Sequence, residues 1–143
     1  MFQGAWAFNR DLDWDTSAAT DMSQMFSSAS IFNGNVSEFK TERVENMYNM
    51  FQSATKFNAD LSKWQTGAVT NMLSMFSEAR TFNADLSKWQ TGAVTNMGSM
   101  FNNACKIFFP SFFSFGVFFP HIFPHISSHF FTFLFRLPTS TTI

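Results

Sequence analysis

The sequence predicts an α/β solenoid, a curved stack of strand–turn–short-helix units with a parallel sheet on one side and helices on the other. Two observations support this prediction. A unit of about 25 residues recurs along the chain, and the apolar residues within each unit pass from a short strand-like segment to helix-like spacing. A single unit leaves its apolar stripe exposed, whereas stacked neighbours cover it.

The repeat is anchored on four phenylalanines that precede asparagine, Phe8, Phe32, Phe57 and Phe82. Their spacings are 24, 25 and 25 residues, because the first copy is one residue shorter between Leu12 and Trp14. The third and fourth copies match at 20 of 25 positions. One repeat domain, 1–106, therefore consists of a partial copy, 1–7, followed by copies 8–31, 32–56, 57–81 and 82–106.

Met1 occupies the repeat position that Met25, Met50, Met75 and Met100 occupy in the later copies. A solenoid needs a polar terminal unit over its first core face, and the sequence before Phe8 supplies none. We therefore expect this chain to be a fragment of a longer array, or a gene model begun at an internal methionine.

Each element of the unit is predicted from the third copy. The segment DLSKW, 60–64, reads as a brief strand, and Gly67 is suited to the turn that follows. From Val69 the apolar intervals are 3, 3, 1 and 3, which is one face of a helix, with Thr66 or Thr70 as its N-cap. The predicted core positions are Phe57, Leu61, Trp64, Val69, Met72, Met75, Phe76 and Ala79.

Methionine and asparagine each recur at fixed repeat positions. All nine methionines fall at two positions of the unit, and we interpret them as core residues rather than a binding surface. An asparagine follows each anchoring phenylalanine, where its amide can satisfy backbone groups and form a ladder between stacked copies. These asparagines are Asn9, Asn33, Asn58 and Asn83.

The segment FNADLSKWQTGAVTNMLSMFSEA resembles the short repeat of BspA-like leucine-rich-repeat surface proteins, also found in mycoplasma-type lipoproteins. The resemblance covers 1–106 and weakens in the second copy, where Phe39 replaces tryptophan; Gly67 and Gly92 replace the usual serine. It implies a leucine-rich-repeat-like solenoid that serves in surface display, adhesion or protein binding. It also implies a cell-surface or secreted location, although the chain shows no signal peptide.

Composition narrows the possible functions. The formal net charge is −1, so no strong field favours nucleic acid, and the single cysteine excludes an internal disulfide framework. The repeats contain no histidine, no Ser/His/Asp arrangement and no glycine-rich phosphate loop. We therefore expect a protein that is not an enzyme and needs no cofactor.

Three motifs resemble known kinds of binding or modification site. Asp11, Asp13 and Asp15 alternate as in a calcium loop, but Thr16 and Met22 stand where an EF-hand needs Gly and Glu, so no metal site is predicted. The histidines His121, His125 and His129 share helical spacing, but Pro124 interrupts the helix and no further ligand lies nearby. The segment Asn35-Val36-Ser37 is a glycosylation sequon, which has meaning only in a secreted chain.

The tail, 107–143, departs from the repeat. It holds 12 of the 22 phenylalanines, all four prolines and a single charge, Arg136. Its composition suits translated polypyrimidine sequence, a gene-model artefact; residues 107–135 are also uncharged and long enough for a membrane anchor, although prolines interrupt them. A hydrophobic cap for the solenoid is the third interpretation. The tail is thus predicted to be irregular or membrane-like.

The sequence favours a binding or display module that meets an unknown protein or cell-surface macromolecule. Core positions repeat, whereas the outward position occupied by Glu38, Lys63 and Lys88 changes its charge between copies. These three residues are the candidate binding site. The alternative is a purely structural spacer without a specific ligand, anchored in a membrane through the tail.

Overall fold

The computed structural model describes residues 1–104, and within them the chain forms no helix and almost no strand. The only paired strand-like positions in this range are isolated parallel bridges, Asp21 with Asn46, Asn46 with Asn71, and Asn71 with Asn96. Around a large buried aromatic cluster, the chain instead follows a series of turns. The described range therefore determines no conventional fold class, because it contains neither the helices nor the sheet of the predicted α/β architecture.

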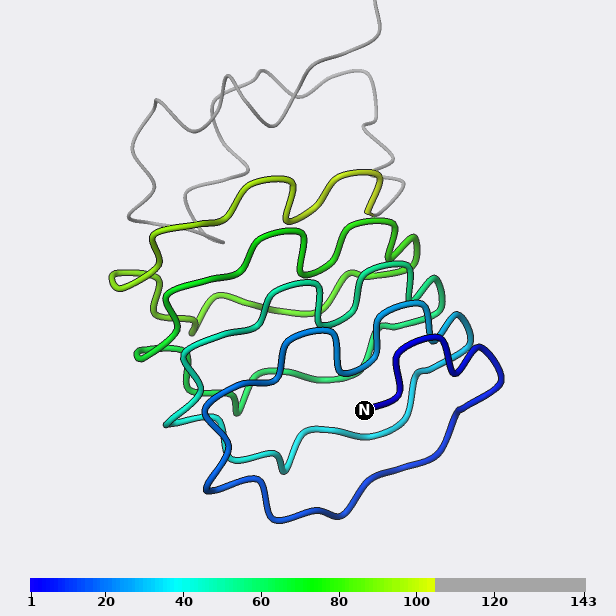
Figure 1. The fold of residues 1–143 in the computed structure, drawn as a ribbon, viewed down its shortest axis with the longest axis horizontal. Coiled ribbons are helices and arrows are strands. Elements are labelled where there is room, and N and C mark those ends of the chain that lie inside the picture. Colours follow the sequence, from blue (N-terminus) through cyan, green and yellow to red (C-terminus); the bar gives the residue numbers. More distant parts are fainter. Residues whose placement is uncertain (105–143) are drawn as a thin grey trace, which may run out of the picture.

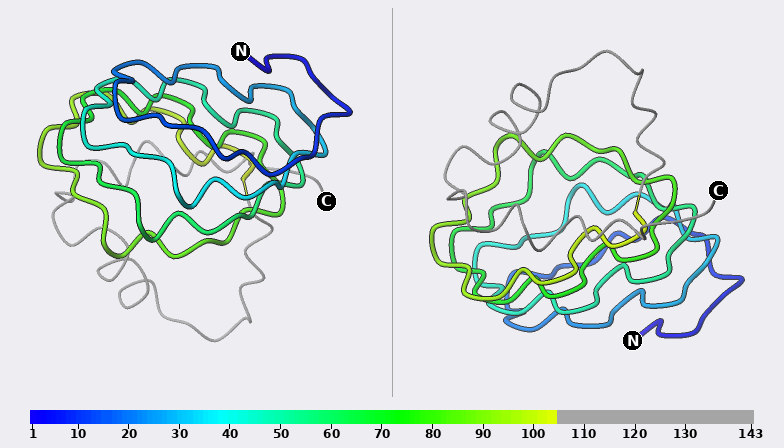
Figure 2. Two further views of the ribbon diagram at one scale, coloured as in Figure 1. Left: turned by 90° about the horizontal axis from the view of Figure 1, so that it is seen from below. Right: turned by 90° about the horizontal axis from the view of Figure 1, so that it is seen from above.

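Each copy forms one coil of a stack, and successive coils lie side by side along the chain (Figure 1; Figure 2). The third copy shows how a coil bends. Backbone N–H groups donate to the carbonyl three residues earlier at Trp64 to Leu61, 3.1 Å, and Val69 to Thr66, 3.0 Å. Each such pair closes a β-turn, so the coil is a polygon of turns joined by short extended segments.

The helix predicted from Val69 is wrong. Two consecutive β-turns occupy this segment, closed by the bonds Met75 N to Met72 O, 3.2 Å, and Ala79 N to Phe76 O, 3.0 Å. The third residue of each turn has left-handed backbone, with φ 53° at Ser74 and 61° at Glu78, as a type II turn requires. Corner residues of two such turns recur at intervals of 3, 1 and 3, which is also the spacing of a helix face.

Stacking is the physical reason for turns in place of a helix. A helix would use its N–H groups within the segment, whereas here Met72, Ser74 and Phe76 donate to carbonyls of the next coil, 2.8–2.9 Å away. A segment this short gains little from helix formation because nucleation is unfavourable. Neighbouring coils supply the acceptors instead.

The brief strand predicted at 60–64 is also wrong. This segment holds the turn between Leu61 and Trp64, and the parallel bridges lie elsewhere in the unit, at Asn71 and its equivalents. The apolar residues of DLSKW occupy turn corners rather than one face of a strand. Parallel pairing between copies was therefore expected in the wrong part of the repeat.

The core predicted from the third copy is confirmed, whereas the prediction that all nine methionines are core residues is wrong at Met1, which is 86% exposed, and holds only in part at Met25 and Met97, which are half-buried. All eight apolar positions assigned to the third copy are buried, and Met72 and Met75 are completely enclosed.

Phenylalanines form two parallel rows through the stack, with ring centroids 5.5–5.7 Å apart between Phe26, Phe51 and Phe76. The two rows meet more closely where the end of one copy passes into the start of the next, as at Phe51 and Phe57, whose ring centroids are 3.8 Å apart. Offset stacking of this kind adds to the free energy gained from apolar burial.

The backbones of the first and second copies approach each other closely at Gly34 and Arg10. A Cβ added at Gly34 would lie 2.1 Å from the Arg10 carbonyl oxygen, so only glycine fits there. The third and fourth copies carry alanine at this position, Ala59 and Ala84, where two units of equal length meet.

Candidate binding surface

Each coil joins its neighbours in two different ways on its two sides. In the third copy, residues 57–68 use side chains for this purpose, and we call them the clamp side. Residues 69–81 use mainly backbone groups, and we call them the tandem-turn side. The same names apply to the equivalent residues of the other copies, and the candidate site lies on the clamp side.

Buried threonines are the strongest contacts of the clamp side. The Thr66 hydroxyl accepts a hydrogen bond from Gln90 N, 2.8 Å, and donates to Gln90 O, 2.9 Å. Thr41 makes the same pair of bonds with Gln65, and Thr16 makes it with Lys40. The prediction that Thr66 or Thr70 caps a helix is wrong, because Thr66 instead bridges two coils and Thr70 donates to Glu45 O.

The predicted asparagine ladder is confirmed. The Oδ1 atom of Asn9 accepts from Asn33 N at 2.8 Å, and the same bond joins Asn33 to Asn58 N at 2.7 Å and Asn58 to Asn83 N at 2.6 Å. The tryptophans add a further bond, since Trp64 Nε1 donates to Val36 O at 3.0 Å. These contacts fix the register of the coils and thereby position the outward residues.

Glu38, Lys63 and Lys88 form a row of exposed charges along the clamp side, which we call the Glu38 row. Glu38 and Lys63 form an ion pair between adjacent coils, and both side chains are about 60% exposed. Lys88 occupies the same position one coil further on and is also exposed. The positive charges of Lys63 and Lys88 both act on Asp60. The structure thus places all three predicted residues on one surface.

Hydrogen bonding and charge shift the pKa values of Glu38, Lys63 and the neighbouring Asp60 so that the charged form of each group is favoured. The hydrogen bond from Lys63, and then the positive charge of Lys63, hold the pKa of Glu38 below its ordinary value. The same hydrogen bond and the negative charge of Glu38 raise the pKa of Lys63. The pKa of Asp60 is lowered chiefly by the hydrogen bonds from Ser62. All three groups are therefore charged over a wide range around neutral pH.

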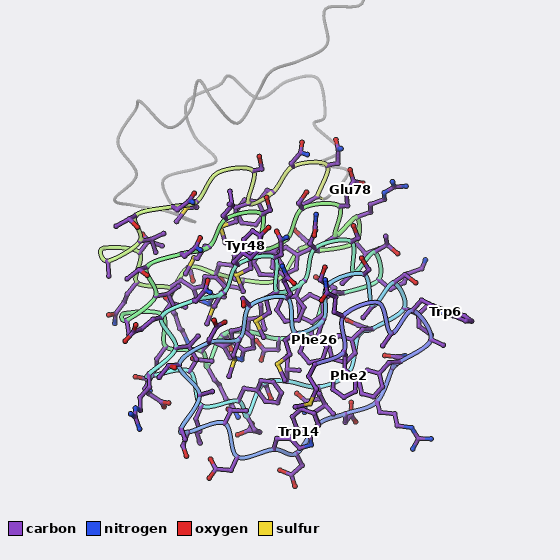
Figure 3. The ribbon with its side chains drawn as sticks, in the orientation of Figure 1. Phe2, Trp6, Trp14, Phe26, Tyr48 and Glu78 are labelled. Atoms are coloured by element: carbon purple, nitrogen blue, oxygen red, sulfur yellow. The ribbon has the colours of Figure 1, made fainter. Side chains whose placement is uncertain are left out.

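Sequence reasoning missed a second variable surface on the tandem-turn side. Residues 57–72 and 82–97 are identical, so every difference between the third and fourth copies lies at positions 73–81. Tyr48, which is labelled in Figure 3, and Leu73 occupy one such position in successive copies, and both are half-buried. The residues that follow them, Asn49 and Ser74, have left-handed backbone. The sequence did contain a signal for this surface, because the differences between the third and fourth copies cluster at positions 73–81. These positions were predicted to lie on a helix and instead lie on two β-turns.

The aspartates weighed as calcium ligands have other roles. Asp11 accepts from Asn35 N at 2.7 Å, and Asp15 accepts from Ser17 N at 3.0 Å. Across residues 1–104, no group of three His, Cys, Asp or Glu side chains is arranged to hold a metal ion. His121, His125 and His129 lie outside the described residues, as does the tail, 107–143.

The sequon asparagine is exposed and belongs to a local turn. Asn35 Oδ1 accepts from Ser37 N at 2.9 Å, and the Ser37 hydroxyl donates to Glu38. Asp60 and Asp85 make the same turn in the later copies, with Ser62 and Ser87 as donors. The turn is therefore a structural feature of the repeat, with or without a glycan.

Among the residues that the structure describes, no helix is long and apolar enough to cross a membrane. The membrane anchor predicted for 107–135 falls outside this range.

A comparison with protein families finds one match. The model of the family described as "Mycoplasma protein of unknown function, DUF285" matches residues 1–109. No curated protein and no solved structure matches the chain.

Proposed function

This chain belongs to the DUF285 family, a Mycoplasma protein family, and from that premise we propose a non-enzymatic repeat protein that binds another macromolecule. The proposed architecture is a leucine-rich-repeat-like solenoid, as the resemblance to BspA-like surface proteins implies. In this proposal the stack displays outward residues at a cell surface and uses them in adhesion or protein binding.

The contrast between constant and variable positions carries this proposal. Asn58 and Thr66 hold the coils in register and have counterparts in the other copies, whereas the outward position of Glu38 changes to lysine in the next two. A stack of this kind presents a row of side chains at fixed spacing, which suits an extended partner surface. The exposed charges of the Glu38 row supply electrostatic complementarity to such a partner.

The ion pair itself favours the second candidate, a structural spacer. Glu38 and Lys63 neutralise each other between adjacent coils, and this contact needs no external ligand. An exposed pair of this kind contributes little to stability because solvent screens it. A charge-swapped variant distinguishes the two functions, because it allows an ion pair at the same two positions and reverses the charges that a partner meets.

The test compares the full chain with the double variant Glu38→Lys, Lys63→Glu in a surface pull-down. The swapped chain can form an ion pair between the same two positions but presents the opposite order of charges, and its new carboxylate at position 63 lies near Asp60. We expect it to lose at least ~10-fold of the binding to any partner captured by the parent chain. The single variant Lys88→Glu, which breaks no ion pair between described residues, is expected to weaken binding less.

Retained capture of every partner by the swapped and Lys88→Glu chains would rule out the Glu38 row as the binding site. Failure of the parent chain to capture any partner would favour the spacer. Circular dichroism of both variants serves as the folding control.

A further inference from the structure

Asn33 is the only asparagine of the chain that precedes a glycine, and it is also a member of the asparagine ladder. Its side chain is exposed. A Cβ on Gly34 would lie 2.1 Å from the Arg10 carbonyl oxygen, so only glycine fits there. The equivalent ladder residues Asn58 and Asn83 are each followed by alanine. Close packing of two coils therefore fixes an Asn-Gly pair at one position of the ladder.

The ladder holds the Asn33 side chain with its carbonyl group polarised. Asn58 N donates to Asn33 Oδ1 at 2.7 Å. A donor on this oxygen stabilises the negative charge that develops there when a nucleophile adds to Cγ. The Asn33 Nδ2 group forms no hydrogen bond within residues 1–104, so no contact in this range opposes its departure. The Asn33 amide is thus prepared for attack at Cγ.

The nearest nucleophile is the next backbone nitrogen, that of Gly34. Its N–H group forms no hydrogen bond within residues 1–104, so no acceptor in this range holds the proton. Glycine also has no Cβ to hinder the approach of this nitrogen to Asn33 Cγ. Asn58 accepts the same ladder bond, from Asn83 N at 2.6 Å, but the Cβ of Ala59 is present beside it. Asn58 is therefore a matched comparison within the same chain.

We propose that Asn33 is a site of spontaneous deamidation, at which the chain modifies itself without an enzyme. Hydroxide takes the proton of Gly34 N, and this nitrogen forms a bond to Asn33 Cγ. The bond between Cγ and Nδ2 then breaks, and Nδ2 leaves as ammonia with a proton from water, which gives a succinimide. Water opens the succinimide at either carbonyl to give aspartate or isoaspartate. The whole reaction consumes one water and releases one ammonia, with no change in oxidation state.

The two products have different effects on the stack. Aspartate keeps an acceptor for Asn58 N and makes that hydrogen bond charge-assisted. Isoaspartate adds one methylene to the main chain beside Gly34, which already lies against the Arg10 carbonyl. We expect aspartate to preserve the register of the first two coils and isoaspartate to disturb it. The reaction involves no residue of the Glu38 row and is independent of the function proposed above.

The experiment incubates the full native chain at pH 8 and follows every asparagine-containing peptide by mass spectrometry, with separation of aspartate from isoaspartate. We expect Asn33 to be converted at least ~5-fold faster than Asn58, with isoaspartate among the products. The variant Ala59→Gly places a second Asn-Gly pair in the same ladder, and it should raise the rate at Asn58 toward that at Asn33. This variant makes the test independent of a substitution at Gly34, where no side chain fits.

Conversion of Asn33 no faster than that of Asn58, a product without isoaspartate, or an unchanged rate at Asn58 in Ala59→Gly would each overturn the proposal. The same incubation in urea tests the contribution of the stack. A rate at Asn33 in the native chain below ~10% of the rate in urea would show that the fold protects this residue, and would also overturn the proposal.

Discussion

The two sides of each coil achieve the same stacking by different chemistry. On the clamp side, Asn58, Trp64 and Thr66 each contact the backbone of an adjacent coil through a side chain. On the tandem-turn side, Ser74 and its neighbours do so through backbone N–H groups. Backbone bonds do not depend on the identity of the residue, whereas side-chain bonds do. The third and fourth copies differ only at positions 73–81, which belong to the tandem-turn side.

Removing one hydroxyl from each side is expected to give the largest contrast. Thr66→Val deletes two bonds to Gln90 at a completely buried position, and we expect a loss of ~2 kcal/mol in the free energy of unfolding. Thr70→Val deletes one exposed bond to Glu45 O, which Thr70 N already occupies, so we expect a loss below ~0.5 kcal/mol. Urea denaturation measures both values, and Thr66→Ser is the control that keeps the hydroxyl.

Equal losses for the two valine variants would contradict the distinction between the sides. A loss for Thr66→Ser as large as that for Thr66→Val would show that the methyl group, not the hydroxyl, determines the effect.

Left-handed backbone is the feature on which the tandem-turn side depends. Ser53 has φ 57°, a conformation that costs ~1 kcal/mol for residues other than glycine. We expect Ser53→Gly to stabilise the protein by ~0.5 kcal/mol and Ser53→Val to destabilise it by more than ~1 kcal/mol. Thermal unfolding of both variants tests this expectation. Ser62→Gly, at a turn position without left-handed backbone, should instead destabilise the protein. A loss of stability for Ser53→Gly together with a gain for Ser62→Gly would refute the assignment of backbone strain to Ser53.

The smallest expected effect is the contribution of Asp21 to the pH dependence of the free energy of unfolding in acid. Hydrogen bonds from Ser23 and Asn46 hold the pKa of Asp21 below its ordinary value, whereas the equivalent residues Asn46, Asn71 and Asn96 have no charge to lose. Because the folded-state pKa is lowered, the contribution of Asp21 is complete above about pH 5 and is lost as pH falls toward 3. The variant Asp21→Asn should therefore be slightly less stable than the parent at pH 7, because it loses the charge and the acceptor for Asn46 Nδ2, and it should show a shallower loss in acid.

Denaturation midpoints between pH 7 and pH 3 measure this effect. Asp13→Asn is the control, because the Asp13 carboxylate forms no hydrogen bond within residues 1–104. An acid profile of Asp21→Asn identical to that of the parent would mean that the charge of Asp21 does not contribute.

Much of the arrangement was predictable from the repeat alone. The copy boundaries gave the neighbours of every coil, and the apolar positions of the third copy, such as Met72 and Phe76, gave the core. The asparagine ladder was also predictable, because a side chain that recurs with each coil contacts its own equivalents. The candidate row of Glu38, Lys63 and Lys88 followed from the same register, although the ion pair within it did not.

Local backbone geometry, in contrast, was decided only by the tertiary structure. The spacing 3, 1 and 3 fits one face of a helix and also the corners of two successive turns, so the sequence around Val69 is consistent with both. The neighbouring coil selects the turns, because its carbonyls accept the N–H groups of Met72, Ser74 and Phe76. The sequence by itself determined which residues are buried and which copies meet, since burial depends on pattern. The path of the backbone between them depends on hydrogen-bond partners that exist only in the stack.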